Sequence, residues 1–223
     1  MTSDGPALDG IKVLFFDLDG TLADTTELIL ATFRDTFAEL GLPQRGDEEL
    51  LSQIGRPLHL QARDIDEGRA QEIFDLYRHL YDVNHDRLAR EFPGVRESLA
   101  GLRERGYRLA VVTSKRSHSA YGDLAYYHLM EYFEVVVTAD DTARHKPEPE
   151  PALKALELLG AQPGEATYIG DSPYDLRCAH AAGVLAGAVE WGPFSREVLQ
   201  EERPDYWVPS PPSLLELFPS PLV

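Results

Sequence analysis

The sequence predicts an α/β fold, in which a Rossmann-like parallel sheet with helices on both faces carries an inserted α-helical cap. The first supporting observation is an apolar segment at residues 11–16, rich in β-branched and aromatic side chains and typical of a buried strand. The second is the region after residue 92, where apolar segments of strand length alternate with segments of helical periodicity. The third is residues 25–91, where apolar residues recur at helical spacing and no strand is predicted.

The individual elements follow from these patterns in order. Residues 26–40 are predicted to form a helix, because Leu28, Ile29 and Phe33 fall on one helical face. Further strands are predicted at residues 107–112, 134–137, 166–169, 184–189 and, at an edge, 205–208. Further helices are predicted at residues 95–105, 117–129, 149–159, 174–182 and 214–218. The first strand belongs with the later strands, so we expect residues 1–24 and 92–223 to form the core and residues 25–91 the cap.

The composition is typical of an acidic globular protein. Of 223 residues, 43% are hydrophobic, and 21 Lys and Arg face 38 Asp and Glu, which gives a formal net charge of −17. Such a surface repels phosphate backbones, so we expect no nucleic-acid partner. The first residues lack a basic segment followed by an apolar one, and the single cysteine, Cys178, has no partner within the chain. We therefore expect a cytoplasmic protein without membrane association, present as a monomer or a homodimer.

Polar side chains follow four of the predicted strands. They are carboxylates, hydroxyls and ammonium groups: Asp17 and Asp19 after the first strand, Thr113, Ser114 and Lys115 after the second, Lys146 after the third, and Asp171 and Asp175 after the fourth. Ligands of an open α/β sheet bind beyond the carboxyl ends of its strands, so we expect these groups to meet at one edge. Clustered carboxylates need a cation to offset their repulsion, and oxygen ligands favour Mg²⁺. Mg²⁺ beside an ammonium and a hydroxyl group forms a site for a phosphoryl group.

Four short motifs make the chain similar to a known family. They are DLDGTLADT at residues 17–25, Thr113 at the end of its strand, Lys146-Pro147, and GDSPYD at residues 170–175. In this order and on these elements, they resemble the four motifs of the haloacid dehalogenase superfamily, and the resemblance covers nearly the whole chain. It implies that residues 25–91 form the α-helical cap of the family's first cap class.

The resemblance also implies a role for each catalytic residue. Asp17 would be the nucleophile that forms an aspartyl-phosphate. Asp19 would act first as the general acid for the leaving oxygen and then as the general base for water. Thr113 and Lys146 would hold the phosphoryl oxygens.

The same resemblance implies the ligands of the metal and of the substrate. Mg²⁺ would be bound by Asp17, the backbone carbonyl of Asp19, Asp171 and, through water or hydrogen bonds, Asp175. Residues that would contact the substrate are Gly20, Thr21, Ser114 and Arg56. The family's cap directs a loop toward the site at the position of Gly55-Arg56-Pro57, and there the guanidinium would bind an anion distal to the reacting phosphorus.

Three functions compete: a phosphohydrolase, a β-phosphoglucomutase-like sugar phosphomutase, and a non-catalytic protein that binds phosphorylated metabolites. The complete set of motif residues argues against the non-catalytic protein. The mutases typically have Glu-Asp where this chain has Gly170-Asp171, and they lack the second carboxylate, Asp175. Arg56 instead favours a mutase, because the mutases use a cap arginine for the distal phosphate. A phosphatase is the favoured function.

The expected substrate is a small phosphorylated metabolite. Residues 135–141 (VVVTADD) and 146–151 (KPEPEP) are similar to the phosphoglycolate phosphatases and the pyrophosphatases related to them. Residues 77–86 of the cap, followed by residues 91–95, are particularly similar to the pyrophosphatase branch. We therefore expect 2-phosphoglycolate or inorganic pyrophosphate to be hydrolysed. Three aromatic residues at helical spacing are expected to form the interior of the cap: Phe74, Tyr77 and Tyr81.

Overall fold

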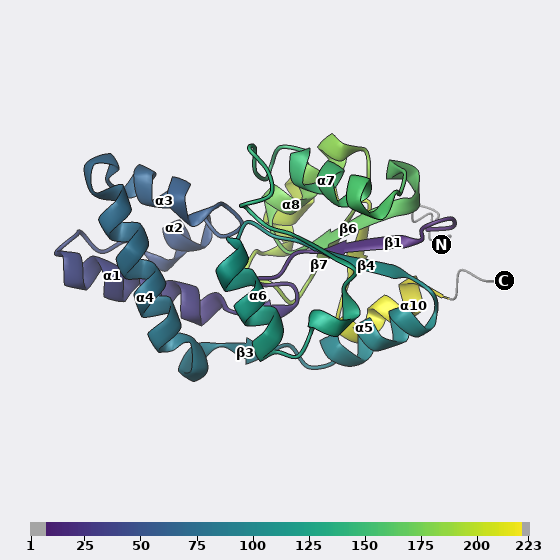
Figure 1. Ribbon diagram of the computed structural model, residues 1–223, viewed down its shortest axis with the longest axis horizontal. Helices are drawn as coiled ribbons and strands as arrows, with labels where there is room; N and C mark the ends of the chain where they lie inside the picture. Colours follow the sequence, from purple (N-terminus) through teal and green to yellow (C-terminus); the bar gives the residue numbers. More distant parts are fainter. Residues whose placement is uncertain (1–7, 220–223) are drawn as a thin grey trace.

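The computed structural model describes residues 8–219, and a six-stranded parallel sheet lies at its centre (Figure 1). The strand order is β5-β4-β1-β6-β7-β8, and every neighbouring pair is parallel. The strands are β1 (Val13–Phe16), β4 (Arg108–Val112), β5 (Val135–Val137), β6 (Ala166–Gly170), β7 (Leu185–Val189) and β8 (Tyr206–Val208). The predicted fold class is confirmed, including the edge strand near residue 206.

Alternating side chains of the strands bury against two separate helical layers. In β1, Val13 and Phe15 pack on one face, whereas Leu14 and Phe16 pack on the other. The first face is covered by α7 (Glu150–Leu159) and α8 (Pro173–Ala182), and the second by α5 (Val95–Glu104) and α10 (Leu214–Leu217) (Figure 1). Burial on both faces explains why these strands are continuously apolar.

A group of helices inserted between β1 and β4 lies beside the sheet (Figure 1). It consists of α1 (Thr26–Leu40), α2 (Asp47–Leu51), α3 (Leu58–Ile65) and α4 (Ala70–Leu88). A two-stranded antiparallel ribbon of β2 (Ala23–Asp24) and β3 (Arg90–Glu91) joins it to the sheet. The division into a core and a cap of residues 25–91 stays a prediction; its boundaries fall at this ribbon.

Several element boundaries differ from the predicted ones. The helix predicted at residues 117–129 is α6 (Ser117–Tyr126); His128 has a positive φ of 54°, a left-handed conformation that an α-helix does not continue. The β2–β3 ribbon was not predicted, since two-residue strands carry no readable alternation. The helix α9 (Arg196–Glu201) was also not predicted.

Within residues 8–219, no helix is long and apolar enough to cross a membrane.

Candidate active site

The site lies at the carboxyl end of β1, where the chain order of the sheet reverses. β1 pairs with β4 on one side and with β6 on the other, so the three strand ends open into one crevice. The backbone N–H of Asp17 donates to the carbonyl of Ile169 at 3.1 Å, and that of Thr113 donates to Val137 at 2.9 Å. The parallel hydrogen-bond ladder therefore extends into the loops and fixes where their side chains begin.

Three carboxylates meet in this crevice. Asp17, Asp171 and Asp175 are all buried, and each offers an oxygen within 4.8 Å of those of the other two. Burial, together with the charges of Asp175 and Asp19, raises the pKa of Asp17 to about 7 although Lys146 opposes the shift. Burial, together with the charges of Asp175 and Asp17, raises the pKa of Asp171 well above its ordinary value.

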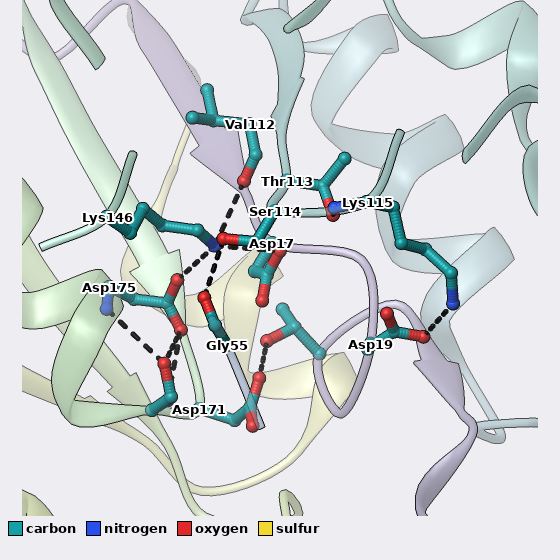
Figure 2. Close-up of polar contacts among 12 residues, drawn as sticks. Asp17, Asp19, Gly55, Val112, Thr113, Ser114, Lys115, Lys146, Asp171 and Asp175 are labelled. Atoms are coloured by element: carbon teal, nitrogen blue, oxygen red, sulfur yellow. Dashed lines mark hydrogen bonds and ion pairs between the residues drawn. The ribbon is translucent and has the colours of Figure 1, made fainter. Parts of the chain in front are cut away.

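Lys146 is the ammonium group of this cluster (Figure 2). Its Nζ lies 3.0 Å from Oδ1 of Asp17 and 2.6 Å from Oδ1 of Asp175, and its side chain is fully buried. Burial lowers its pKa, but the two carboxylates outweigh this effect and raise it above the ordinary value. The hydroxyl of Tyr168 lies 3.0 Å from Nζ and donates to the carbonyl of Val112 at 2.6 Å, which ties the ammonium to two strands.

Hydrogen bonds from the loops orient the two downstream carboxylates. Thr21 donates to Oδ1 of Asp171 at 2.7 Å, and Ser172 donates to Oδ2 of Asp175 from its hydroxyl at 2.6 Å. Asp175 also completes a capping box with Ser172 at the start of α8. Gly20 has a φ of +77°, and a Cβ there would lie 2.5 Å from Oδ2 of Asp171, so the loop needs glycine at this position.

The donor set fits a hard divalent cation. Oδ2 of Asp171 is buried and accepts no hydrogen bond from any residue that the structure describes. A buried carboxylate oxygen without a donor is costly unless a cation neutralises it. All three side chains offer oxygen only, which matches the preference of Mg²⁺ or a similar ion. The cluster of Asp17, Asp171 and Asp175 can therefore hold a divalent metal.

Asp19 faces the other side of the crevice (Figure 2). Its Oδ1 accepts from the Nζ of Lys115 at 2.5 Å and from the hydroxyl of Thr25 at 2.6 Å. Lys115 also lies 2.8 Å from Oδ2 of Asp123 on α6 and donates to the hydroxyl of Tyr81 on α4 at 2.7 Å. The two aspartates of the first loop thus have separate lysine partners.

A cavity of about 90 Å³ extends from these groups to the inserted helices. Its inner end carries Asp17, Asp19 and Thr113. Its opposite wall is mostly apolar and aromatic: Ile29, Phe33, Ile54, Leu58, Phe74, Tyr77 and Tyr81. The three predicted cap aromatics therefore line the cavity while they pack inside the cap.

Two predicted substrate contacts have protein partners in this structure. The hydroxyl of Ser114 donates to the carbonyl of Gly55 at 2.6 Å and so connects the core to the inserted helices. Arg56 lines the cavity, but its guanidinium lies 2.7 Å from Oδ2 of Asp64 and also donates to Gln53. The predicted contacts of Gly20, Thr21, Ser114 and Arg56 with substrate stay predictions.

Three residues that the structure places at the site were not predicted from the sequence: Tyr168, Asp123 and His85. Lys115 was expected at this edge, directly after Thr113 and Ser114 at a strand end, but without a specific role. Asp123 carried no readable signal, because a single aspartate on a helix is ordinarily solvated.

Comparison with known sequences agrees with this arrangement. The family model described as "Haloacid dehalogenase-like hydrolase" matches residues 14–189. A pyrophosphatase PpaX from Bacillus cereus is 38% identical over 207 residues, which cover 93% of this chain and 96% of that protein. A protein from Caldanaerobacter subterraneus, also described as pyrophosphatase PpaX, is 41% identical over 207 residues, covering 93% and 94% of the two chains.

Solved structures agree as well. A structure from Lactobacillus plantarum, described as a phosphoglycolate phosphatase, superposes with a TM-score of 0.84 at 27% identity and covers 93% of this chain and 99% of that one. A haloacid dehalogenase-like family hydrolase from Streptococcus pneumoniae gives 0.84 at 28% identity, covering 94% and 99%. The family model and these relatives, together with the cluster of Asp17, Lys146, Asp171 and Asp175, show that the chain belongs to the haloacid dehalogenase-like hydrolase family and is a phosphatase of that family.

Proposed function

We propose that this phosphatase hydrolyses a small phosphorylated metabolite in a Mg²⁺-dependent reaction through an aspartyl-phosphate on Asp17. Inorganic pyrophosphate is the first candidate substrate and 2-phosphoglycolate the second. The observation that carries the proposal is the cluster of Asp17, Asp171 and Asp175, within 4.8 Å of one another and directly beside the Lys146 ammonium. Such a cluster can hold a cation and a phosphoryl group together, with a carboxylate oxygen beside both.

The residues around Asp17 prepare it for attack on phosphorus. When bound, Mg²⁺ supplies positive charge that offsets both the carboxylates and the phosphoryl oxygens. Asp17, Asp171, the backbone carbonyl of Asp19 and, directly or through water, Asp175 would hold it. Lys146 lies 3.0 Å from Asp17 and keeps the carboxylate charged and oriented, and with Thr113 it would bind the phosphoryl oxygens.

Asp19 is proposed to move the protons. In the first half-reaction its carboxyl donates a proton to the leaving oxygen, and in the second it accepts a proton from the water that attacks the aspartyl-phosphate. Thr25 already holds this side chain at 2.6 Å. The apolar wall formed by Phe33, Ile54 and Tyr77 excludes water from the cavity and thereby strengthens the charge interactions inside it.

Similarity favours pyrophosphate, and the cavity wall favours a substrate with a second anionic group. Two relatives that are 41% and 38% identical over nearly the whole chain are named pyrophosphatases. 2-Phosphoglycolate is favoured as the second candidate by the solved structure described as a phosphoglycolate phosphatase, at lower identity. Both molecules carry a second anionic group beyond the reacting phosphorus, which Arg56 on the cavity wall would bind.

We further propose a cytoplasmic location and a cap of residues 25–91.

A sugar phosphomutase is the rival reaction on this fold. A structure from Bacteroides vulgatus described as a β-phosphoglucomutase has 25% identity and a TM-score of 0.82. The fourth motif argues against transfer back to a sugar, because Asp175 supplies a further buried carboxylate there.

A substrate panel tests the proposal. The protein is stripped of metal and assayed with Mg²⁺ on pyrophosphate, 2-phosphoglycolate, glucose 1-phosphate and glucose 6-phosphate. We expect phosphate release from pyrophosphate at the highest kcat/KM and no release in excess chelator. Interconversion of the two glucose phosphates without release of phosphate would contradict the proposal.

A further inference from the structure

Lys115 has contacts that the proposed reaction does not yet explain. It follows Thr113 and Ser114 in the loop after β4, and its side chain is 12% exposed. Its Nζ lies 2.5 Å from Asp19, 2.8 Å from Asp123 and 2.7 Å from the hydroxyl of Tyr81 (Figure 2 shows the contact with Asp19). A lysine placed between two carboxylates needs only one of them to keep its charge balanced.

The contacts with Asp123 and Tyr81 keep the ammonium in place when Asp19 turns away. Asp123 is itself supported by His85 on α4, whose Nε2 lies 3.1 Å from Oδ1. Burial would lower the pKa of Lys115, but Asp123, Asp19 and Tyr81 outweigh it and raise the pKa well above its ordinary value. The ammonium therefore stays charged and in place. When Asp19 moves away, Lys115 is still paired with Asp123.

The position of Asp19 indicates which part of the substrate would bind next to the Lys115 ammonium. A general acid has to be within hydrogen-bond reach of the leaving oxygen. The leaving group then occupies the part of the cavity lined by Asp19 and Lys115. Because Oδ1 of Asp19 accepts from the ammonium and from Thr25, Oδ2 is the oxygen that would carry the proton, and the leaving oxygen would bind beside Oδ2 and within reach of Lys115.

We propose that Lys115 selects leaving groups that carry their own negative charge, by exchanging its contact with Asp19 for a contact with the leaving anion. This inference rests on the proposed function. The bond between phosphorus and the leaving oxygen breaks as the bond to Asp17 forms, its electron pair stays on the leaving oxygen, and that oxygen takes the proton from Asp19. Oδ2 of Asp19 supplies that proton, and the ammonium stabilises the negative charge that the leaving group keeps on its second anionic group. The substrate class is a phosphate joined to a second anion, either phosphate or carboxylate.

The other cations on the cavity wall are less suited to this task. Arg56 is paired with Asp64 at 2.7 Å, and Arg116 is paired with Asp140 at 2.6 Å. Arg78 on α4 has no ion pair among residues 8–219, and it packs over the ring of Phe74. Arg78 is the rival for the distal anion, since it lines the same cavity without contacting Asp19.

The test compares substrates that differ only in the charge of the leaving group. 2-Phosphoglycolate and 2-hydroxyethyl phosphate both release an alcohol of similar size, and only the first carries a carboxylate; pyrophosphate is assayed beside them. We expect Lys115→Met to lower kcat/KM for pyrophosphate and 2-phosphoglycolate about 10- to 100-fold, the range for a lost hydrogen bond to a charged group. For 2-hydroxyethyl phosphate, we expect a change below about threefold, within the scatter of a neutral substitution.

Three variants make the outcome decisive. Lys115→Arg keeps the charge and should retain the preference for anionic leaving groups, and Lys154→Met, a remote exposed lysine, should change nothing. Removal of a buried ammonium can unfold the protein, so Lys115→Met is also combined with Asp123→Asn, which removes one positive and one negative charge together. This double variant should show the same selective loss.

Each contrary result has a distinct meaning. An equal loss for all three substrates would show that Lys115 only positions Asp19, and it would overturn the inference while leaving the proposed function intact. Selective loss in Arg78→Met but not in Lys115→Met would assign the distal anion to α4 and also overturn it. Failure of the wild-type protein to hydrolyse any of the three phosphates would overturn the proposed function and the inference together.

Discussion

Asp17 and Asp19 lie two residues apart, yet different parts of the molecule neutralise their side chains. Asp17 faces Lys146 and Asp171, which come from loops after strands of the sheet, and Asp175, which lies in the first turn of α8. Asp19 faces Lys115, whose further partners come from α6 and from the inserted helix α4. Under the proposed function, the first half would hold a metal and a phosphoryl group, and the second half would serve proton transfer and the leaving group. The sheet would then position the residues that attack phosphorus, whereas the contacts with the leaving group would depend on the inserted helices.

The largest expected effect comes from the sheet half of the site. Asp17→Asn removes the nucleophilic oxygen and one metal ligand while it preserves shape, so we expect kcat to fall about 10⁵-fold or more, as when other covalent nucleophiles are lost. Steady-state assays on the best substrate of the panel measure this, with thermal melting to verify folding. Asp75→Asn on the exposed face of α4 is the matched control. An Asp17→Asn protein with a tenth of the wild-type activity would refute the assignment.

The second largest effect is expected in the half of the site around Asp19. Asp19→Asn should reduce kcat/KM for pyrophosphate about 10²- to 10⁴-fold, the usual contribution of general acid–base catalysis. Formation of the phosphoenzyme from p-nitrophenyl phosphate should be partly spared, because p-nitrophenolate leaves without a proton. Rapid-quench kinetics with both substrates distinguish the two steps. Equal losses in the first step for both substrates would show that Asp19 is not the acid.

Mg²⁺ binding to the half of the site around Asp17 should depend on pH. In the metal-free protein, burial and neighbouring carboxylates raise the pKa of Asp17 to about 7 and that of Asp171 well above its ordinary value, whereas both ionise near 3.9 when unfolded. Between these values the folded state binds more protons, so stability falls as the pH rises from about 4 to 7. Mg²⁺ binds the ionised form, and therefore it should raise the Tm more at pH 8 than at pH 5.

Thermal melting with and without Mg²⁺ at the two pH values measures this difference. Asp171→Asn should abolish the Mg²⁺-dependent rise, since it removes a ligand from the cluster. A Tm shift of the same size at pH 5 and pH 8 would contradict the account, because the metal would then not compete with protons for these carboxylates.

The smallest expected effect concerns Arg56. Its guanidinium is engaged by Asp64, so contact with a distal anion replaces one charged partner by another. We expect Arg56→Ala to lower kcat/KM for pyrophosphate by less than about tenfold, equivalent to 1.4 kcal/mol, and to leave 2-hydroxyethyl phosphate unchanged. A loss larger than that of Lys115→Met would place the specificity of the site in the Gly55–Pro57 loop instead.

The sheet half of the site was predictable from the sequence because strand geometry is regular. Apolar segments locate the strand ends, and a parallel sheet brings consecutive ends to one edge, so Asp17, Lys146 and Asp171 had to lie close together. Cys178 lies on α8 among the apolar side chains that cover one face of the sheet, and burial raises the pKa of its thiol to about 12.

In the half of the site around Asp19, the partners of Lys115 were not predictable, because they depend on how the helices pack. Asp123 and Tyr81 are far apart in sequence, on helices whose relative position is set by packing. Nothing in their local sequence distinguishes Asp123 from a solvated helix residue, and Tyr81 follows the apolar spacing of α4. The hydrogen bonds from Thr21 to Asp171 and from Ser114 to Gly55 likewise appear only in three dimensions.

The most direct test of the division between Asp17 and Asp19 is mass spectrometry of the Asp19→Asn protein, quenched in acid during turnover of p-nitrophenyl phosphate with Mg²⁺. The account predicts a protein heavier by one phosphoryl group, carried by the peptide that contains Asp17, because the nucleophile is intact and the base for the second step is missing. An unmodified protein that still turns over substrate, or a phosphoryl group on any other residue, would contradict it.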